Sequence, residues 1–512
     1  MARYIIAHDV GTSGDKAVLV DAEGHIYGKV FEPYRTFYPK PGWAEQEPED
    51  WWRAVTSGTR ALLEKTGVSP KDVLCVTFST QMINIVPLGA RGEVIRRAII
   101  WIDNRAGEQA ERIMRRFINA EVFALIAGAT LSGKDGLPKL LWLKENEPHV
   151  YERMAFFVDV AGYLFYRSTG NAVMEWSGAS VFGIDLKKKA WLTGLFQYIG
   201  LDASKFPSLV RSIDKVGNLT AGAAREYGLL EGTPVIAGAG DAPCALIGSG
   251  AVDEGDGHVC LGTSGWVGVT TKRTPRGKCG VATIQSADPD KAFLIAETEA
   301  AGACLQWLAD EMYGKEKIEY GVPDVYAFMD REVAEVPPGS NCVLFTPWLY
   351  GERAPVDDCY VRAAFFNLSA EHRRRDMLRA VYEGVAYNIR WLVEIVEKEF
   401  KFPLPVLRVI GGGAKSKPWM QILADVTKRR VEAVANPQEA GAVGAALVAG
   451  VGLGIYRDFA SLKKVLRIDG VFQPRAQNSE VYDSLFDAYK EVYRSLRQFY
   501  SKLNRERFNR SV

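Results

Sequence analysis

The sequence has few residues of the kinds that cross-link a chain or bind zinc. Seven cysteines are spread over 512 residues without a Cys-x-x-Cys pair, and five histidines complete no zinc-binding spacing. These absences argue against a disulfide-stapled secreted domain and against the common zinc modules. They predict reduced thiols in a cytoplasmic protein.

A strong net charge is also absent. Lysine and arginine together number 63 against 62 aspartates and glutamates, which gives a formal net charge of +1. Nucleic-acid and anionic-membrane binders usually carry a basic surplus, so neither partner is expected.

Long apolar runs are scarce. The N-terminal segment MARYIIAHDVGTSG is not a signal peptide, because its short apolar run breaks at Asp9. Residues 440–456, AGAVGAALVAGVGLGIY, carry no charge, but glycine and alanine gain little on transfer to lipid. This stretch therefore predicts a closely packed internal helix, and the predicted class is a soluble enzyme.

What is present is enough chain for two large hydrophobic cores. Short β-rich segments and helical periodicity alternate along it, and strands followed by helices occur twice, which predicts two α/β domains in tandem. The expected strands are residues 3–9, 15–21, 25–31, 73–78, 234–238, 258–261, 266–271 and 406–410. The expected helices include residues 48–65, 418–428 and most of 478–512.

A four-residue turn is repeated about 250 residues apart. Gly11-Thr12-Ser13-Gly14 follows the first strand, and Gly262-Thr263-Ser264-Gly265 follows a strand in the second half. The strand–turn–strand setting is the same in both places. Such turns offer backbone N–H groups and hydroxyls to a phosphate chain, so we predict two phosphate turns facing each other across a cleft.

Asp9 ends the first strand and Lys16 lies a few residues beyond it. A carboxylate at a strand end can hold a hydrated magnesium ion, which prefers few protein ligands and several waters. Lys16 would neutralise phosphate charge. The alternative is a plain hairpin with a turn-stabilising aspartate.

Asp241 follows the buried run 234–239 and stands between glycine and alanine in Gly-Asp-Ala. Apolar neighbours raise the basicity of a carboxylate by desolvation, so Asp241 is a candidate proton acceptor for an attacking hydroxyl. The alternative is an aspartate that caps a helix beginning near Pro243.

Two further segments have the composition of ligand sites. Residues 411–416, GGGAKS, follow a strand and precede a helix, a setting that suits an anion or an adenine ribose. Trp101, Asp103 and Arg105 follow an apolar run, and Gln81 and Met82 follow the strand 73–78. A polyhydroxylated ligand needs such stacking and hydrogen-bonding groups. The alternative is an exposed turn with a local Asp103–Arg105 pair.

Taken together, these motifs resemble the FGGY family of carbohydrate kinases, and among them the xylulose kinases most. The resemblance extends from about residue 3 to 455 and is specific because the motifs occur together and in order. They are DVGTSxxK from Asp9, GWAEQxPEDWW from Gly42, WxDxR from Trp101, GDA around Asp241, LGTSG from Leu261, GERxP from Gly351, GGGA from Gly411 and ExxAxGAA from Glu439.

The resemblance implies an α/β fold of two ribonuclease-H-like domains of the actin and hexokinase superfamily, with a cleft between them. Residues 1–246 would form the N-terminal domain, with the sugar side and the first phosphate turn. Residues 247–512 would form the C-terminal domain, with the second phosphate turn and the adenosine site. The implied reaction is ATP- and Mg²⁺-dependent phosphorylation of a sugar or polyol hydroxyl, with a xylulose-type ketose favoured and a homodimer left open.

The resemblance also implies roles for individual residues. Asp241 matches the catalytic base and Asp9 the magnesium-associated carboxylate. The ATP-binding residues would be Gly11, Thr12, Ser13, Lys16, Gly262, Thr263, Ser264, Gly412, Gly413, Ala414 and Ser416, and the sugar side would be lined by Gln81, Met82, Trp101, Asp103 and Asp241.

Three positions depart from the family pattern. Ile83 stands where xylulose kinases usually carry a histidine, which removes an expected hydrogen bond to the sugar. Asn367 replaces a usual glycine, and His8 precedes Asp9 where small or apolar residues are usual. For His8, a buried neutral imidazole and a perturbation of Asp9 are the two interpretations.

Two other functions remain open at this point. One is a kinase of the same family with another acceptor, such as gluconate, ribulose, fuculose or glycerol. The other is an actin- or chaperone-like ATPase that uses the same nucleotide cleft for assembly; the candidate base Asp241 and the Trp101–Arg105 segment favour transfer to a small molecule.

Overall fold

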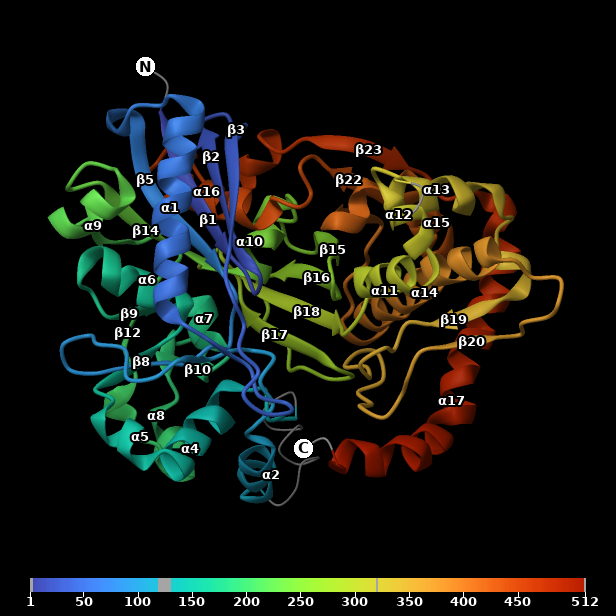
Figure 1. Cartoon of the computed structure of the whole chain (residues 1–512), viewed down its shortest axis with the longest axis horizontal. Helices are drawn as coiled ribbons and strands as arrows, with labels where there is room; N and C mark the ends of the chain where they lie inside the picture. Colours follow the sequence, from blue (N-terminus) through green and yellow to red (C-terminus); the bar gives the residue numbers. More distant parts are fainter. Residues whose placement is uncertain (1–2, 118–129, 319–320, 511–512) are drawn as a thin grey trace.

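The computed structural model describes residues 3–117, 130–318 and 321–510, and it has two sheets side by side (Figure 1). The first has the order β13-β14-β5-β1-β2-β3 and the second the order β17-β18-β16-β15-β21-β22-β23. Their strands are β1 Tyr4–Val10, β2 Gly14–Asp21, β3 Ile26–Pro33, β5 Val73–Thr80, β13 Lys215–Asn218, β14 Pro234–Gly240, β15 Gly257–Leu261, β16 Gly265–Thr271, β17 Val281–Gln285, β18 Ala292–Thr298, β21 Val406–Ile410, β22 Arg430–Val434 and β23 Ile468–Phe472.

The two sheets repeat one topology. In the first, β1, β2 and β3 form an antiparallel meander, and β5 and β14 add parallel strands beside β1. In the second, β15, β16 and β18 are antiparallel, and β21 and β22 add parallel strands beside β15. This repeat confirms the prediction of two α/β units and of an N-terminal meander. The strands of the two sheets that were not predicted are β13, β17, β18, β22 and β23.

Among the described residues, five pairs of short strands lie outside the two main sheets, four of them in the first half of the chain. They are β4 Glu45–Gln46 with β7 Ala98–Ile99, β6 Val86–Leu88 with β8 Phe156–Val158, β9 Val173–Glu175 with β12 Ser208–Val210, β10 Ile184–Asp185 with β11 Ala190–Trp191, and β19 Leu344–Thr346 with β20 Ala364–Phe366.

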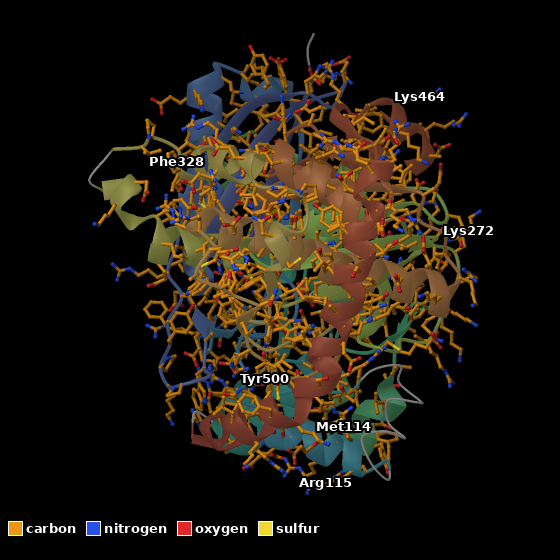
Figure 2. The ribbon with its side chains drawn as sticks, turned by 90° about the vertical axis from the view of Figure 1, so that its right-hand side faces the viewer. Met114, Arg115, Lys272, Phe328, Lys464 and Tyr500 are labelled. Carbon is orange, nitrogen blue, oxygen red and sulfur yellow. The ribbon has the colours of Figure 1, made fainter. Side chains whose placement is uncertain are left out.

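Helices cover both sheets, and the long α17 runs down the C-terminal half with Tyr500 near its end (Figure 2). The helix predicted over residues 48–65 is α1, and that over 418–428 is α15. The described helices are α1 Pro48–Thr66, α2 Gly107–Arg115, α4 Gly136–Asn146, α5 Pro148–Arg153, α6 Val160–Thr169, α7 Trp176–Ser180, α8 Thr193–Ile199, α9 Ala221–Tyr227, α10 Asp241–Gly248, α11 Gly302–Met312, α12 Gly314–Ile318, α13 Val325–Glu335, α14 Arg374–Phe400, α15 Lys417–Thr427, α16 Ala440–Gly452 and α17 Ser479–Arg510.

The helices α10 and α16 cross between the two halves at a close backbone contact. A Cβ on Gly444 would lie 1.9 Å from the carbonyl oxygen of Cys244, and a Cβ on Gly248 would lie 1.9 Å from that of Ala440. Only glycine permits this approach on both sides. The uncharged stretch is therefore a buried inter-unit helix, as predicted, and none of the described helices is long and apolar enough to cross a membrane.

The predicted domain boundary after residue 246 falls within α10. α16 belongs by sequence to the second half, yet it packs against β1, β5 and β14 of the first sheet. The boundary stays a prediction, and the two helices tie the halves together at the base of the site.

Candidate active site

The first Gly-Thr-Ser-Gly turn joins β1 to β2 and is fixed from outside through its carbonyl groups. The side chain of Gln46 donates to the carbonyl of Thr12 at 2.7 Å, the hydroxyl of Tyr34 donates to that of Gly11, and the backbone N–H of Tyr34 donates to that of Ser13. Among the described residues, the N–H groups of Thr12 and Ser13 have no acceptor. The turn thus presents free donors, as an anion site requires.

The second turn joins β15 to β16 and is held by the start of α11. Backbone N–H groups of Gly302 and Ala303 donate to the carbonyls of Gly262 and Thr263, at 2.7 and 3.0 Å. A Cβ on Gly302 would lie 2.5 Å from the carbonyl oxygen of Gly262, so glycine is needed there. In the part of the chain that the structure describes, no acceptor takes the N–H groups of Thr263 and Ser264.

Asp9 lies beside the first turn with both carboxylate oxygens in contact with donors. Oδ1 accepts from the hydroxyl of Ser79 at 2.8 Å, and Oδ2 lies 3.1 Å from Nζ of Lys16. The start of α16 closes the other side, since a Cβ on Gly441 would lie 2.9 Å from Oδ1. The described residues contain no group of three or more His, Cys, Asp or Glu that could hold a metal ion by themselves. A magnesium ion held by one carboxylate, phosphates and water fits this donor set.

His8 points away from Asp9, because successive side chains of a strand face opposite sides of the sheet. It is fully buried, with Nδ1 2.7 Å from Oδ2 of Asp15 and Nε2 3.0 Å from the hydroxyl of Thr59 in α1. The histidine therefore joins the back of the turn to α1, and it has no direct contact with Asp9.

Asp241 is brought to the site by a bulge in β14. The register against β5 shifts between Val235 and Gly238, and Gly238 has a φ of 69°. A Cβ at Gly238 would lie 1.9 Å from the carbonyl oxygen of Phe78, so only glycine fits the bulge. Asp241 is the first residue of α10 and Gly240 is its N-cap. The alternative of an Asp241 cap on a helix beginning near Pro243 is wrong, because the helix begins two residues earlier.

The surroundings of Asp241 favour its protonated form. Burial, reinforced by the negative charge of Asp9, raises the pKa of Asp241 to about 7. The charge of Asp9 in turn raises the pKa of Lys16, which also contacts that carboxylate. The charges of Asp241, Lys16 and Asp9 all act on Cys260, which lies two residues before Gly262. The groups predicted from the two halves therefore converge.

The predicted sugar side is connected to the first phosphate turn. The indole Nε1 of Trp101 donates to the hydroxyl of Thr12 at 2.8 Å, and Nε2 of Gln81 donates to Oε1 of Gln46 at 2.7 Å. Met82 reaches the strand end before Asp241, since a Cβ on Gly240 would lie 2.5 Å from its sulfur. Trp101 and Gln81 thus adjoin the first turn and its support Gln46, and Met82 adjoins the strand end before Asp241.

Asp103 differs from its expected place. It is fully buried, and its oxygens accept from the backbone N–H of Ala44 at 2.6 Å and from the guanidinium of Arg105 at 2.7 to 3.0 Å. The alternative of an exposed Asp103–Arg105 turn is wrong, because Arg105 is also buried and pairs with Glu45. In this conformation Asp103 shapes the loop and has no surface that a sugar touches.

The predicted adenosine segment lies against the second turn. A Cβ on Gly411, whose φ is 86°, would lie 2.6 Å from the backbone of Leu261, and one on Gly413 would lie 2.7 Å from Trp419. Gly412 and Ala414 stand in the same short helical turn, Gly412–Lys415. The hydroxyl of Ser416 caps α15 and donates to Asp330 at 2.6 Å, so it is already engaged within the protein.

Several residues of the site were not predicted. The carboxylate of Glu175 caps α7 and accepts from Ser177, whose hydroxyl in turn accepts from the backbone N–H of Gly240 at 2.9 Å. Burial raises the pKa of Glu175 to about 8. Lys139 is buried beside the sugar side, and a lone lysine within LPKLLWL was the signal in the sequence.

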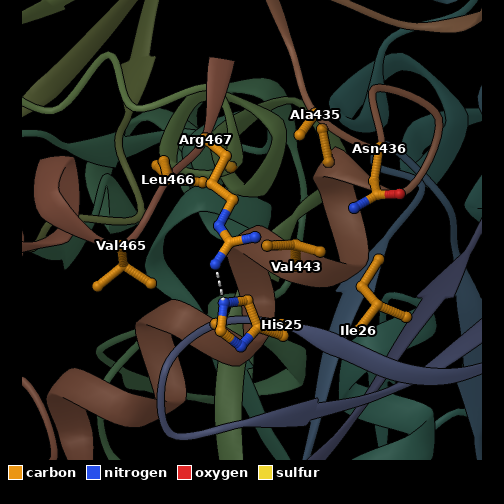
Figure 3. Close-up of a pocket in the computed structure, with 11 residues that line it drawn as sticks. His25, Ile26, Ala435, Asn436, Val443, Val465, Leu466 and Arg467 are labelled. Atoms are coloured by element: carbon orange, nitrogen blue, oxygen red, sulfur yellow. Dashed lines mark hydrogen bonds between the residues drawn. The ribbon is translucent and has the colours of Figure 1, made fainter. Parts of the chain in front are cut away.

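Two cavities lie between the halves. One of about 500 Å³ adjoins the first turn and is lined by Ser13, Lys16, Lys29, Lys65 and Glu439, a basic wall that suits phosphates. The other, of about 360 Å³, lies between the β2–β3 turn and α16, where His25 contacts Arg467 at 2.6 Å (Figure 3). None of the predicted site residues lines the second cavity.

Comparison with known proteins places this geometry in a family. Residues 4–248 match the N-terminal domain of the FGGY family of carbohydrate kinases, and residues 257–453 match its C-terminal domain. The chain belongs to the FGGY family of carbohydrate kinases. It is 33% identical to the xylulose kinase of Bacillus subtilis over 96% of this chain and 97% of the relative, and 25% identical to the gluconokinase of that species over 98% of both.

Solved structures agree with the FGGY assignment. The ligand-bound xylulose kinase of Lactobacillus acidophilus superposes with a TM-score of 0.88 at 25% identity, covering 98% of this chain and all of the other. The xylulose kinase of Rhodospirillum rubrum gives 0.86 at 27% identity, covering 97% of this chain and all of the other. The actin- and hexokinase-like two-domain fold is confirmed. As an FGGY kinase, the chain is an ATP-dependent sugar phosphotransferase, and the prediction of an assembly ATPase is set aside.

Proposed function

We propose that this FGGY kinase phosphorylates a ketose of the xylulose type, with Asp241 as the general base. The observation that carries the proposal is the position of Asp241: it stands at the start of α10, beside Met82 of the sugar side, and burial and Asp9 raise its pKa to about 7. A base with a pKa near the working pH combines sufficient ionisation with sufficient basicity.

In the proposed mechanism, Asp241 takes the proton of the sugar hydroxyl that attacks the terminal phosphate. One oxygen, Oδ1, accepts from the N–H of Ala242 at 2.8 Å, which fixes the carboxylate and leaves the other oxygen for the hydroxyl. The N–H groups of Thr12, Ser13, Thr263 and Ser264 donate to the phosphates, and Lys16 adds positive charge. Positioning and electrostatics supply most of the rate in such transfers.

Asp9 would hold the magnesium ion, through ordered water or directly. When bound, Mg-ATP supplies the phosphoryl group, and the metal neutralises charge that develops on the phosphate oxygens. The Ser79 and Lys16 contacts orient the Asp9 carboxylate for this role. Gly412, Gly413 and Ala414 would carry the adenosine, and Ser416, which caps α15, would support their turn.

A hydrogen-bonding atom on the sugar side also supports a polyol acceptor. Oε1 of Gln81 is buried and has no partner among the described residues. The amide orientation is fixed, because Oε1 of Gln46 accepts from Trp51 and so takes the NH₂ end of Gln81. Like Asp103, this oxygen is closed to a ligand in the present conformation, so a sugar hydroxyl would satisfy it after a shift of the loop that follows β5.

The charges on this side favour a neutral acceptor over an aldonate such as gluconate. A carboxylate substrate needs a cation within reach, but the guanidinium of Arg105 is buried in its own ion pairs, and Lys139 is buried against backbone carbonyls. Xylulose itself lacks the histidine partner expected at Ile83, so related ketoses belong in the test.

The experiment is a coupled ADP-release screen over pentuloses, hexuloses, polyols and aldonates at saturating Mg-ATP. The proposal expects the highest kcat/KM with a ketose. A clear preference for gluconate or glycerol would contradict the acceptor assignment and leave the family assignment intact.

A further inference from the structure

Lys139 is a lysine in α4 with no exposed surface. Its ammonium group lies 2.8 Å from the carbonyl oxygen of Ile100, 3.4 Å from that of Ile83 and 3.5 Å from that of Trp101. The helical residues around it are buried and mostly apolar. The charged end of the side chain therefore rests on three backbone carbonyls.

These carbonyls belong to two separate loops. Ile83 lies in the loop after β5, next to Met82, and Ile100 and Trp101 begin the loop after β7. Asn84 makes a second link between the loops, because its Nδ2 donates to the carbonyl of Gln81 and its Oδ1 accepts from the N–H of Trp101, both at 2.9 Å. The two linked loops are those that carry the proposed sugar contacts.

Burying an ammonium without a carboxylate partner is costly. None of the ion pairs within the described ranges includes Lys139. Burial lowers the pKa of Lys139 to about 7; the charges of Asp103 and Asp135 oppose this shift, and those of Arg105 and Lys134 add to it. An apolar side chain would fill the same place in α4 without that cost. What the ammonium adds is a further attachment between the loops, beyond the backbone pair of Ile85 and Ile99 at their bases and the Asn84 link.

We propose that Lys139 is a positioning residue that locks the two acceptor loops together and thereby sets how tightly the kinase holds its sugar. It does not touch the sugar or the phosphate. Its effect passes through the backbone that places Gln81 and Trp101. The inference deepens the proposed acceptor site and rests on it.

The test compares Lys139→Met with Lys144→Met in the full-length enzyme. Lys144 is an exposed lysine on the same helix that donates to the carbonyl of Gly200 at 2.5 Å, away from the acceptor loops, so it controls for the loss of a lysine–carbonyl bond from α4. We expect Lys139→Met to raise the KM for the best sugar of the screen by about tenfold or more, because small misplacements of groups that position a substrate weaken its binding strongly. The KM for ATP should change less than about twofold. Lys144→Met should change neither. An unchanged sugar KM in Lys139→Met, or equal rises for sugar and ATP, would overturn the proposal.

Two further measurements separate this inference from the acceptor assignment. Hydrogen exchange of the apo enzyme needs no substrate, and amides of residues 81–86 and 100–104 should exchange faster in Lys139→Met than in Lys144→Met. Equal exchange would overturn the loop attachment, whereas failure of every sugar in the screen would overturn only the acceptor assignment. If Lys139→Met does not fold, Asn84→Ala cuts the other side-chain link and leaves the Ile85–Ile99 backbone pair in place, as Lys139→Met does. An unchanged sugar KM in that variant would refute the dependence of sugar affinity on side-chain attachment of the loops.

Discussion

The indole of Trp101 donates a 2.8 Å hydrogen bond to the hydroxyl of Thr12. The bond joins a residue of the proposed sugar side to the first phosphate turn, so the proposed binding sites for the sugar and for ATP are directly connected. Trp101→Phe keeps an aromatic face and removes this bond, worth about 1 kcal/mol net. We expect kcat/KM for the sugar to fall roughly fivefold in steady-state assays. Trp191→Phe removes a 2.7 Å indole bond to Pro207 elsewhere, and an equal effect there would contradict the link.

Asp9→Asn tests the magnesium assignment. Asparagine keeps the size of the side chain and an oxygen for the bond from Ser79, so the melting temperature should stay near that of the parent enzyme. Loss of the negative charge should lower kcat by about 100-fold or more at saturating magnesium, in line with losses of single electrostatic groups in active sites. Asp21→Asn, at the other end of β2, is the control. Near-native turnover of Asp9→Asn would mean that Asp9 only stabilises the turn and does not hold the magnesium ion.

Ile83→His tests acceptor choice at the position where xylulose kinases usually carry histidine. Ile83 has a φ of 61°, a conformation that β-branched residues rarely adopt and histidine tolerates better, so the variant should be at least as stable. A new hydrogen bond is worth about 1 kcal/mol net. We therefore expect kcat/KM for xylulose to rise about fivefold relative to the best native acceptor. If xylulose is already the best substrate of the unmodified enzyme, the position does not need a histidine.

Gly444→Ala tests the crossing of α10 and α16. A methyl group there would lie 1.9 Å from the carbonyl oxygen of Cys244, and such overpacking costs about 1–3 kcal/mol. The melting temperature should fall by several degrees. Gly222→Ala in α9 has no atom within 4 Å of the added methyl and should be neutral or stabilising. Equal melting temperatures for the two variants would contradict the close crossing.

Local chemistry made much of the fold predictable. The glycine turns and β-branched strands of residues 3–31 gave the meander, and the isolated aspartate after a buried run placed Asp241 at a strand end. Asn367, which replaces a usual glycine, has a φ of 63°, and asparagine is among the few residues that adopt this conformation readily. Its departure from the pattern therefore preserves the turn.

The long-range contacts of the site were not predictable in this way. Asp103 looks like a polar loop residue in sequence, but its burial depends on Ala44, which arrives from a distant segment, and its partner Arg105 is held by Glu45 of that same segment. Lys139 reads as a surface lysine or an interruption of an apolar run until its three carbonyl partners are known. Such contacts join residues tens of positions apart, and periodicity carries no information about them.

Asp241→Asn tests the assignment of the general base, and the melting temperature of this variant controls for a structural role of Asp241. Folding raises the pKa of Asp241 from 3.8 to about 7. Between pH 3.8 and about pH 7, the folded protein therefore binds a proton at Asp241 that the unfolded chain has already lost. The resulting stability is present at acid pH and is lost as the pH rises through about 7. Asparagine does not ionise, so the variant does not lose this stability as the pH rises. Its melting temperature at pH 8 should be equal to or higher than that of the parent enzyme, and the difference should be smaller at pH 5. A large drop in melting temperature at pH 8 would mean that Asp241 has a structural role.

The most direct test of the account is the turnover of Asp241→Asn at pH 8, measured by ADP release with saturating sugar and Mg-ATP on a preparation shown to bind ATP. General-base assistance contributes about 10²–10⁴-fold, so kcat should fall by that order while ATP binding persists. In the unmodified enzyme, kcat should decline as the pH falls through about 7, because the base becomes protonated. Near-native turnover of Asp241→Asn would contradict the assignment of Asp241 as the base.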